Sequence, residues 1–198
     1  MENLKKRYSE YTKVRETFEE AGVLDQVAKA LELTANVFRS GGTVYFCGNG
    51  GSAADSQHFA GEFRDTKPYG DVTFRSLSLT DAPSVTAISN DYGDQHAFEY
   101  QLRTMGKLGD LVYGISTSGK AVNVRRVLDI AKEMGIYRIG IVGNGELHHE
   151  IVSRSDIAIV IPSADTQQVQ IGYFEMLHWL WLGIKDVFEM EIKNKQVV

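Results

Sequence analysis

A histidine and a glutamate at helical spacing, His58 and Glu62, are the residues of this sequence best placed to do chemistry together. Four positions apart, they would lie on one face of a helix, where an imidazole and a carboxylate can share one metal ion or one proton. The alternative interpretation is a solvated helix pair that contributes only about 0.2–0.5 kcal/mol. The spacing alone leaves both interpretations open.

The segment before this helix has the composition of an anion-binding loop. Residues 43–47 are a β-branched and aromatic run that predicts a strand, and the glycines that follow permit positive φ and close backbone approach. Ser52 and Asp55 predict a capping box at the helix start. The free N–H groups of such a start would face a phosphate or a sugar hydroxyl.

A second loop of this kind follows the apolar run 110–115. It contains Ser116, Thr117 and Ser118 before Gly119, and a helix with an apolar face begins shortly afterwards. Its hydroxyls and free N–H groups can hold a phosphate dianion without a lysine, although a serine-rich N-cap is the ordinary alternative. Two strand–loop–helix units at the carboxyl ends of strands together favour a phosphorylated ligand.

A dinucleotide site is the competing interpretation of the first loop. Gly48, Gly50 and Ala53 fit the loose pattern G-x-G-x-x-A. A dinucleotide site would also need an acidic residue about 20 positions further on, at the end of the next strand. Asp81, the nearest candidate, lies much further along, so this interpretation ranks second.

The elements that must position these loops alternate between strands and helices. This alternation predicts an α/β fold, a three-layer αβα sandwich whose parallel sheet is covered on both faces. We expect one domain over residues 1–198, with an N-terminal helical arm at 1–41 and an α/β core at 42–198. Five strands are predicted, at residues 43–47, 72–79, 110–115, 137–142 and 157–161.

The last predicted helix, residues 166–188, has a broad apolar face and also contains Gln170 and His178. Eight positions separate these two residues, which corresponds to ~12 Å of helix rise on one face. A short helix is expected to begin at Asp81 and to end near Gly93.

The charge, cysteine count and hydropathy of the chain argue against several kinds of partner and site. The 198 residues carry a formal net charge of −5, which argues against a nucleic-acid backbone as the main partner. A single cysteine, Cys47, excludes an internal disulfide and a CxxC metal site. The sequence opens with no signal-peptide pattern and contains no long apolar run, so we expect a cytoplasmic protein without a membrane partner.

Taken together, the motifs resemble those of the phosphoheptose isomerases, which belong to the sugar isomerase (SIS) family. The resemblance covers nearly the whole chain, and its most specific part is the combination of Glu62, Gln170 and His178. The other matching segments are Cys-Gly-Asn-Gly-Gly-Ser at 47–52, Gln-His-Phe-Ala-Gly-Glu at 57–62, Ser-Asn-Asp-Tyr-Gly at 89–93 and Gly-Ile-Ser-Thr-Ser-Gly at 114–119.

This resemblance implies a flavodoxin-like, or Rossmann-like, SIS domain that interconverts sedoheptulose 7-phosphate and D-glycero-D-manno-heptose 7-phosphate, the first step of nucleotide-activated heptose and lipopolysaccharide synthesis. It implies a homotetramer with active sites at subunit interfaces, with Glu62 as general base and His178 as general acid. It also implies a zinc ion. The implied zinc ligands are His58, Glu62, Gln170 and His178. The implied substrate-binding residues are Asn49, Gly50, Gly51, Ser52, Asn90, Asp91, Ser116, Thr117, Ser118 and Gln170.

Two other functions are compatible with the same motifs, and at one position the sequence differs from the family pattern. A non-catalytic SIS module that binds a phosphosugar or a protein, of the type associated with replication initiators, tends to lack the glutamate at the position of Glu62. An isomerase of a hexose or pentose phosphate is the other alternative. Ala121 stands where the family often has a serine, which puts one phosphate hydrogen bond in doubt.

Overall fold

The strands are short apolar runs, and the alternation of their side chains decides which face of the sheet each residue covers. The computed structural model describes residues 1–64 and 72–196. In β1 (Thr43–Gly48), Val44 and Phe46 pack into one apolar cluster, whereas Tyr45 and Cys47 pack into another. Because successive side chains of a strand point to opposite faces, the two clusters form separate apolar layers on either side of the sheet.

All five strands are parallel, and their order in the sheet is β2-β1-β3-β4-β5. This flavodoxin-like order reverses between β1 and β3, whose register pairs Gly48 with Ile115. The loops after these two strands therefore lie side by side at the carboxyl edge of the sheet, where open α/β sheets bind ligands. The remaining strands are β2 (Arg75–Ser78), β3 (Leu111–Ile115), β4 (Tyr137–Gly143) and β5 (Ile157–Ile161).

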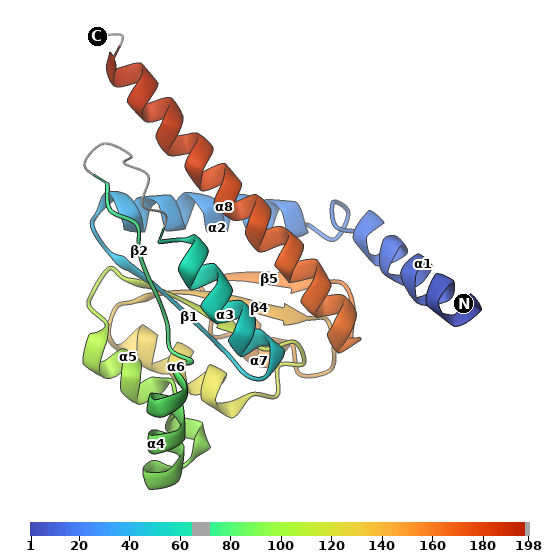
Figure 1. The fold of residues 1–198 in the computed structure, drawn as a ribbon, viewed down its shortest axis with the longest axis horizontal. Coiled ribbons are helices and arrows are strands. Elements are labelled where there is room, and N and C mark those ends of the chain that lie inside the picture. The colour runs from blue at the N-terminus through green and yellow to red at the C-terminus, as the bar shows by residue number, and fades with distance from the viewer. Residues whose placement is uncertain (65–71, 197–198) are drawn as a thin grey trace.

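Helices cover both faces of the sheet, as Figure 1 shows. One face is covered by α2 (Val23–Arg39), α3 (Gly51–Glu62) and α8 (Thr166–Gln196). The other is covered by α5 (Glu99–Met105), α6 (Val122–Glu133) and α7 (His149–Val152). Between β2 and α5, the chain forms α4 (Ala82–Tyr92) and the 3₁₀ turn η1 (Asp94–His96).

Two helical segments extend beyond the sheet in Figure 1, namely α1 (Glu2–Glu16) and the C-terminal part of α8. No residue of α1 is buried, and this helix contacts α8 through Glu175, which accepts hydrogen bonds from Tyr11 (3.0 Å) and from Nε of Arg15 (2.8 Å). Near the other end of α8, Glu191 forms an ion pair with Arg39 of α2. Both projecting segments are thus attached to the body of the protein by polar contacts.

The predicted α/β architecture with a five-stranded parallel sheet is confirmed. The last helix is longer than predicted and reaches Gln196 rather than Phe188, because no glycine or proline follows to end it. Asp81 begins α4 as predicted, since its Oδ2 accepts the Ser84 N–H at 3.2 Å. None of the helices in the described ranges is long and apolar enough to span a membrane.

Candidate active site

The loop after β1 turns directly into α3 with the help of a glycine. Gly50 occupies the N-cap position with a φ of 55°, and no side chain caps the helix. The predicted capping box is therefore wrong, because Ser52 lies inside the first turn and Asp55 is bonded elsewhere. The N–H groups of Gly51 and Ser52 make no backbone hydrogen bond within the described ranges, so they remain available to an anion.

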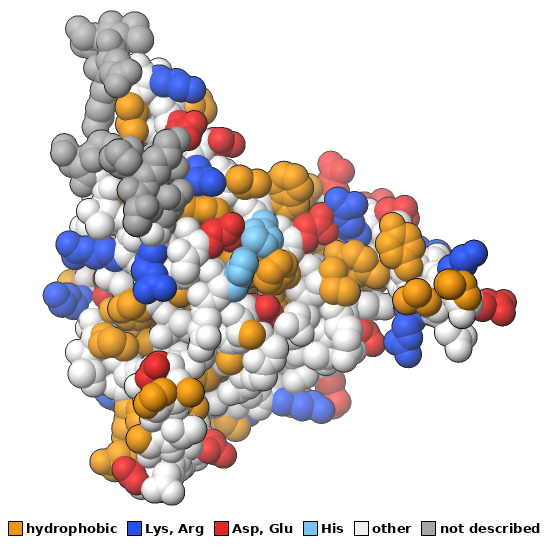
Figure 2. All heavy atoms as spheres, viewed as in Figure 1, with side chains coloured by type: hydrophobic (Ala, Val, Ile, Leu, Met, Phe, Trp, Pro, Cys, Tyr) orange, Lys and Arg blue, Asp and Glu red, His pale blue; other side chains and the backbone are white. Residues whose placement is uncertain are grey.

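Three ligand-type side chains converge between α3 and α8. Nδ1 of His178 lies 3.2 Å from Oε1 of Glu62 and 3.1 Å from its Oε2. Nε2 of His58 lies 3.8 Å from Oε2 of Glu62, and the three ligand atoms are all within 4.8 Å of one another. The fold thus brings His178 next to His58 and Glu62, although more than a hundred positions separate it from them in the sequence. Figure 2 shows histidine side chains together on the face where α3 and α8 lie.

The surroundings of this group favour a bound cation. Oε2 of Glu62 is buried and accepts no hydrogen bond of good geometry from residues 1–64 and 72–196, although Nδ1 of His178 lies 3.1 Å away. The rings of His58 and His178 pack edge to face, 5.3 Å apart, and both contact Phe174, which limits their rotation. Two imidazoles and a carboxylate form a ligand set typical of zinc. The residues therefore fit the implied zinc ion.

A chain of hydrogen bonds joins the N-terminal parts of α3 and α8. The Tyr173 hydroxyl donates to Oδ2 of Asp55 at 2.6 Å, and Nε2 of Gln170 donates to the same oxygen at 2.7 Å. Oγ of Ser52 lies 2.9 Å from the Tyr173 hydroxyl. Burial, together with the bond to Asp55, raises the pKa of Tyr173, which therefore remains a neutral donor.

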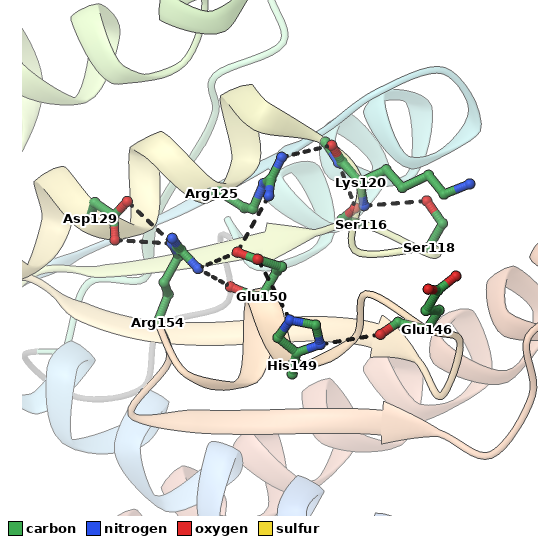
Figure 3. Close-up of polar contacts among 10 residues, drawn as sticks. Ser116, Ser118, Lys120, Arg125, Asp129, Glu146, His149, Glu150 and Arg154 are labelled. Carbon is green, nitrogen blue, oxygen red and sulfur yellow. Dashed lines mark hydrogen bonds and ion pairs between the residues drawn. The ribbon is translucent and has the colours of Figure 1, made fainter.

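The loop after β3 is held by its neighbours. Gly119 has a φ of 75°, and a Cβ there would approach the carbonyl oxygen of Leu147 to 2.1 Å, so only glycine fits. Figure 3 shows that Nη2 of Arg125 donates to the Lys120 carbonyl at 3.3 Å while its Nη1 lies 3.3 Å from Glu150. The guanidinium of Arg125 thus connects the end of this loop to α7.

One further predicted substrate residue, Asn49, lines a cavity of about 450 Å³. Asn49 and Asn123 line it and exchange two hydrogen bonds of 2.8 and 2.9 Å. Asp94, which also lines it, follows shortly after Asn90 and Asp91. Those two residues end α4, are exposed, and are bonded to each other at 2.8 Å. The cavity therefore brings the segment after α4 to the loop after β1.

Some polar residues of these networks were not singled out by the sequence reasoning. Tyr173 stands three positions after Gln170, a spacing that places both on one helix face and that could have linked them to Asp55. Glu99, with only 4% of its surface exposed, accepts hydrogen bonds from Arg126 at 2.7 Å and from His96 at 3.2 Å. The i, i+3 spacing of His96 and Glu99 was the available signal for this second group.

The dinucleotide interpretation is not supported by the geometry. Asp81 would have to face a ribose, but its carboxylate caps α4. Nδ1 of His148 and Nδ1 of His149 bond to nearby backbone carbonyls at 2.8 and 3.1 Å. They stay outside the candidate site.

Comparison with known proteins places the chain among sugar isomerases. The family model described as "SIS domain" matches residues 8–143. The phosphoheptose isomerase of Trichlorobacter lovleyi is 41% identical over 165 residues, which is 81% of this chain and 82% of that protein. The phosphoheptose isomerase of Campylobacter jejuni is 35% identical over 187 residues, which is 93% of this chain and 98% of that protein.

Solved structures show the same likeness. The phosphoheptose isomerase of Neisseria gonorrhoeae superimposes with a TM-score of 0.84 at 30% identity and covers 93% of this chain and 98% of its own. A phosphoheptose isomerase of Francisella tularensis superimposes with a TM-score of 0.83 and covers 93% of this chain and 97% of its own; at 24% identity it supports the fold alone.

Proposed function

The chain belongs to the phosphoheptose isomerases of the SIS domain family, and we propose that it interconverts sedoheptulose 7-phosphate and D-glycero-D-manno-heptose 7-phosphate. The observation that carries this proposal is the convergence of Glu62 and His178 from two helices, α3 and α8, which both begin at the carboxyl edge of the sheet. Aldose–ketose isomerisation needs a base and an acid on adjacent atoms of one substrate. A carboxylate and an imidazole 3.1–3.2 Å apart meet that need.

In the proposed reaction, the carboxylate of Glu62 removes the proton from the carbon next to the carbonyl. The imidazole of His178 donates a proton to the carbonyl oxygen as charge develops there, which gives an enediol. Reversal of these transfers on the neighbouring carbon completes the isomerisation. Phe59 and Phe174 pack against the histidine rings and restrict their orientation.

The phosphate is proposed to lie at the carboxyl ends of β1 and β3. The free N–H groups of Gly51 and Ser52 and the hydroxyls of Ser116, Thr117 and Ser118 are the proposed donors. The Ala121 N–H donates to Oγ of Ser116 at 3.4 Å. The side chain of Ala121 is a methyl group where the family often has a serine hydroxyl, so this position offers the phosphate no hydroxyl. Asn49, Gly50, Asn90, Asp91 and Gln170 are proposed to contact the sugar.

A zinc ion is proposed to bind at His58, Glu62 and His178, with Gln170 as a further ligand. When bound, zinc would polarise the substrate carbonyl as a Lewis acid. The buried Oε2 of Glu62, which accepts no hydrogen bond of good geometry from the described residues, supports this part of the proposal.

A homotetramer with active sites at subunit interfaces is proposed as the working form. Apolar side chains remain exposed on α1, at the start of α2 and on the outer side of α8, a pattern typical of surfaces that pack against another subunit. These side chains are Leu4, Tyr8, Leu24, Ile171, Trp179 and Met190. Light scattering coupled to size exclusion would measure the assembly directly.

The test is conversion of sedoheptulose 7-phosphate followed by NMR, with fructose 6-phosphate and ribulose 5-phosphate in parallel. Glu62→Gln and His178→Gln should lose activity, whereas His149→Gln, a substitution at an exposed histidine outside the site, should keep it. Saturable binding of the heptose phosphate without turnover by zinc-loaded wild type would refute the enzyme and favour the non-catalytic module. Turnover of only a shorter sugar would refute the proposed substrate. The product is proposed to enter nucleotide-activated heptose and lipopolysaccharide synthesis.

A further inference from the structure

A reciprocal pair of amides connects the loop after β1 to the start of α6. Nδ2 of Asn49 donates to Oδ1 of Asn123 at 2.8 Å, and Nδ2 of Asn123 donates to Oδ1 of Asn49 at 2.9 Å. The two bonds close a ring, so neither amide can rotate without breaking both of them. Asn49, an exposed side chain in a loop, is therefore held in one position.

The backbone of α6 decides which way this pair is oriented. The Val124 N–H also donates to Oδ1 of Asn123, at 3.0 Å. A backbone N–H can only donate, so Asn123 must turn its oxygen to that side, and this oxygen must meet the NH₂ group of Asn49. Val124 is buried in the first turn of α6, where N–H groups have no partner within the helix. The orientation of Asn49 is thus set by a rigid element outside its own loop.

The pair lines a cavity of about 450 Å³ together with the segment after α4 and the first residues of α6. An amide has two N–H hydrogens and an oxygen with two lone pairs. Asn49 uses one hydrogen and one lone pair in the bonds to Asn123, so one of each remains for a ligand. A donor and an acceptor on one fixed amide suit the hydroxyls of a sugar, because each hydroxyl can both donate and accept.

We propose that Asn123 is a positioning residue that fixes the amide of Asn49 before the substrate arrives, so that Asn49 binds the hydroxyls of the sugar chain without first losing rotational freedom. This inference rests on the proposed function, in which Asn49 contacts the sugar. Immobilising one side chain on binding weakens a dissociation constant by about 2- to 10-fold. The bonds to Asn123 remove this cost.

The test is the dissociation constant of reduced sedoheptulose 7-phosphate, which lacks the carbonyl and cannot be isomerised, measured by calorimetry. Asn123→Ala should weaken its binding by about 2- to 10-fold. Binding of inorganic phosphate should not change, because its proposed donors lie in the two loops and not in the amide pair. In turnover of the unreduced sugar, the KM should rise while kcat stays the same, as expected for a contact made equally in the ground state and the transition state. Equal binding of the reduced sugar phosphate by Asn123→Ala and wild type would overturn the inference.

A double variant separates positioning from direct contact and from general damage. If Asn123 acts only through Asn49, then Asn49→Ala and the double variant Asn49→Ala/Asn123→Ala should bind the reduced sugar phosphate equally. Losses that multiply in the double variant would overturn the inference. Asn36→Ala is the matched control, because it removes an exposed asparagine of α2 that accepts a hydrogen bond from Arg39, and it should bind like wild type.

One measurement follows the pair without any ligand. The side-chain amide signals of Asn49, assigned by their disappearance in Asn49→Ala, should show one proton shifted downfield by its hydrogen bond, and Asn123→Ala should remove this shift. Signals typical of a free amide in wild type would overturn the inference. If Asn123→Ala binds the reduced sugar phosphate more weakly than wild type, but wild type does not convert the unreduced sugar, the proposed reaction fails while this inference stands. Failure of wild type to bind the reduced sugar phosphate overturns both.

Discussion

A single added methyl group at Gly51 should disturb the site through one hydrogen bond. The new Cβ would lie 2.5 Å from Nε2 of Gln170, so the amide must move away. An amide at the end of a flexible side chain can usually move at little cost, but this one donates to the buried carboxylate of Asp55 at 2.7 Å. The cost of Gly51→Ala is therefore the loss of that bond.

The expected change in the free energy of unfolding of Gly51→Ala is the balance of two opposing contributions. A hydrogen bond to a charged group contributes about 1.5–3 kcal/mol, and replacing glycine by alanine in a helix returns about 0.5–1 kcal/mol. The net loss in the free energy of unfolding should be about 1.5 kcal/mol, which corresponds to a melting temperature lower by about 3–6 °C in a chain of this size.

Gly61→Ala, in the same helix, is the matched control, because a Cβ there meets nothing within 4 Å. Urea unfolding of both variants is the assay, and Gly61→Ala should be as stable as wild type or more stable. Equal stability of the two variants would refute the reasoning that Gln170 is fixed by Asp55.

Three further predictions concern other parts of the molecule. Burial opposes the charge on Glu99, but the hydrogen bond and charge of Arg126 outweigh it and hold the pKa of Glu99 below its usual range. The stability that this carboxylate contributes is therefore fully present above its pKa in the unfolded chain, and it is lost as the pH falls through its lower pKa in the folded protein. At pH 7, Glu99→Gln should be less stable than wild type by about 2 kcal/mol. Unfolding curves measured at decreasing pH should show this difference shrink. Glu150→Gln should raise the KM for the sugar phosphate by no more than about fivefold, with kcat unchanged, because it frees Arg125 from a partly exposed ion pair. A loss of kcat would contradict this positioning role. Burial raises the pKa of the Cys47 thiol, so a thiol reagent should react with it only at the rate of unfolding, and rapid labelling of the native protein would contradict its burial.

Much of the architecture could be predicted because strands and helices have local signals. The runs 43–47, 110–115, 137–142 and 157–161 became strands, since each is apolar and bounded by turn residues. The parallel arrangement of the sheet followed from the alternation of strands with helices, whereas no local signal gives the order of the strands within it.

The site was less predictable, because its contacts join residues far apart in sequence. His58 and Glu62 carry a local signal, but no periodicity indicates that His178 would reach Glu62. Asp55 looked like a helix cap because capping boxes are defined by spacing alone, whereas the positive φ of Gly50 moved the cap and freed Asp55 for Gln170. Only the packing of α8 on α3 decides such pairs.

The central claim, proton transfer by Glu62 through an enediol, is tested most directly by isomerisation in D₂O. Wild type should place deuterium on the carbon that receives the proton in the product, and Glu62→Gln should place none there while it still binds the sugar phosphate. Deuterium incorporation by Glu62→Gln at the wild-type rate would contradict the role of Glu62.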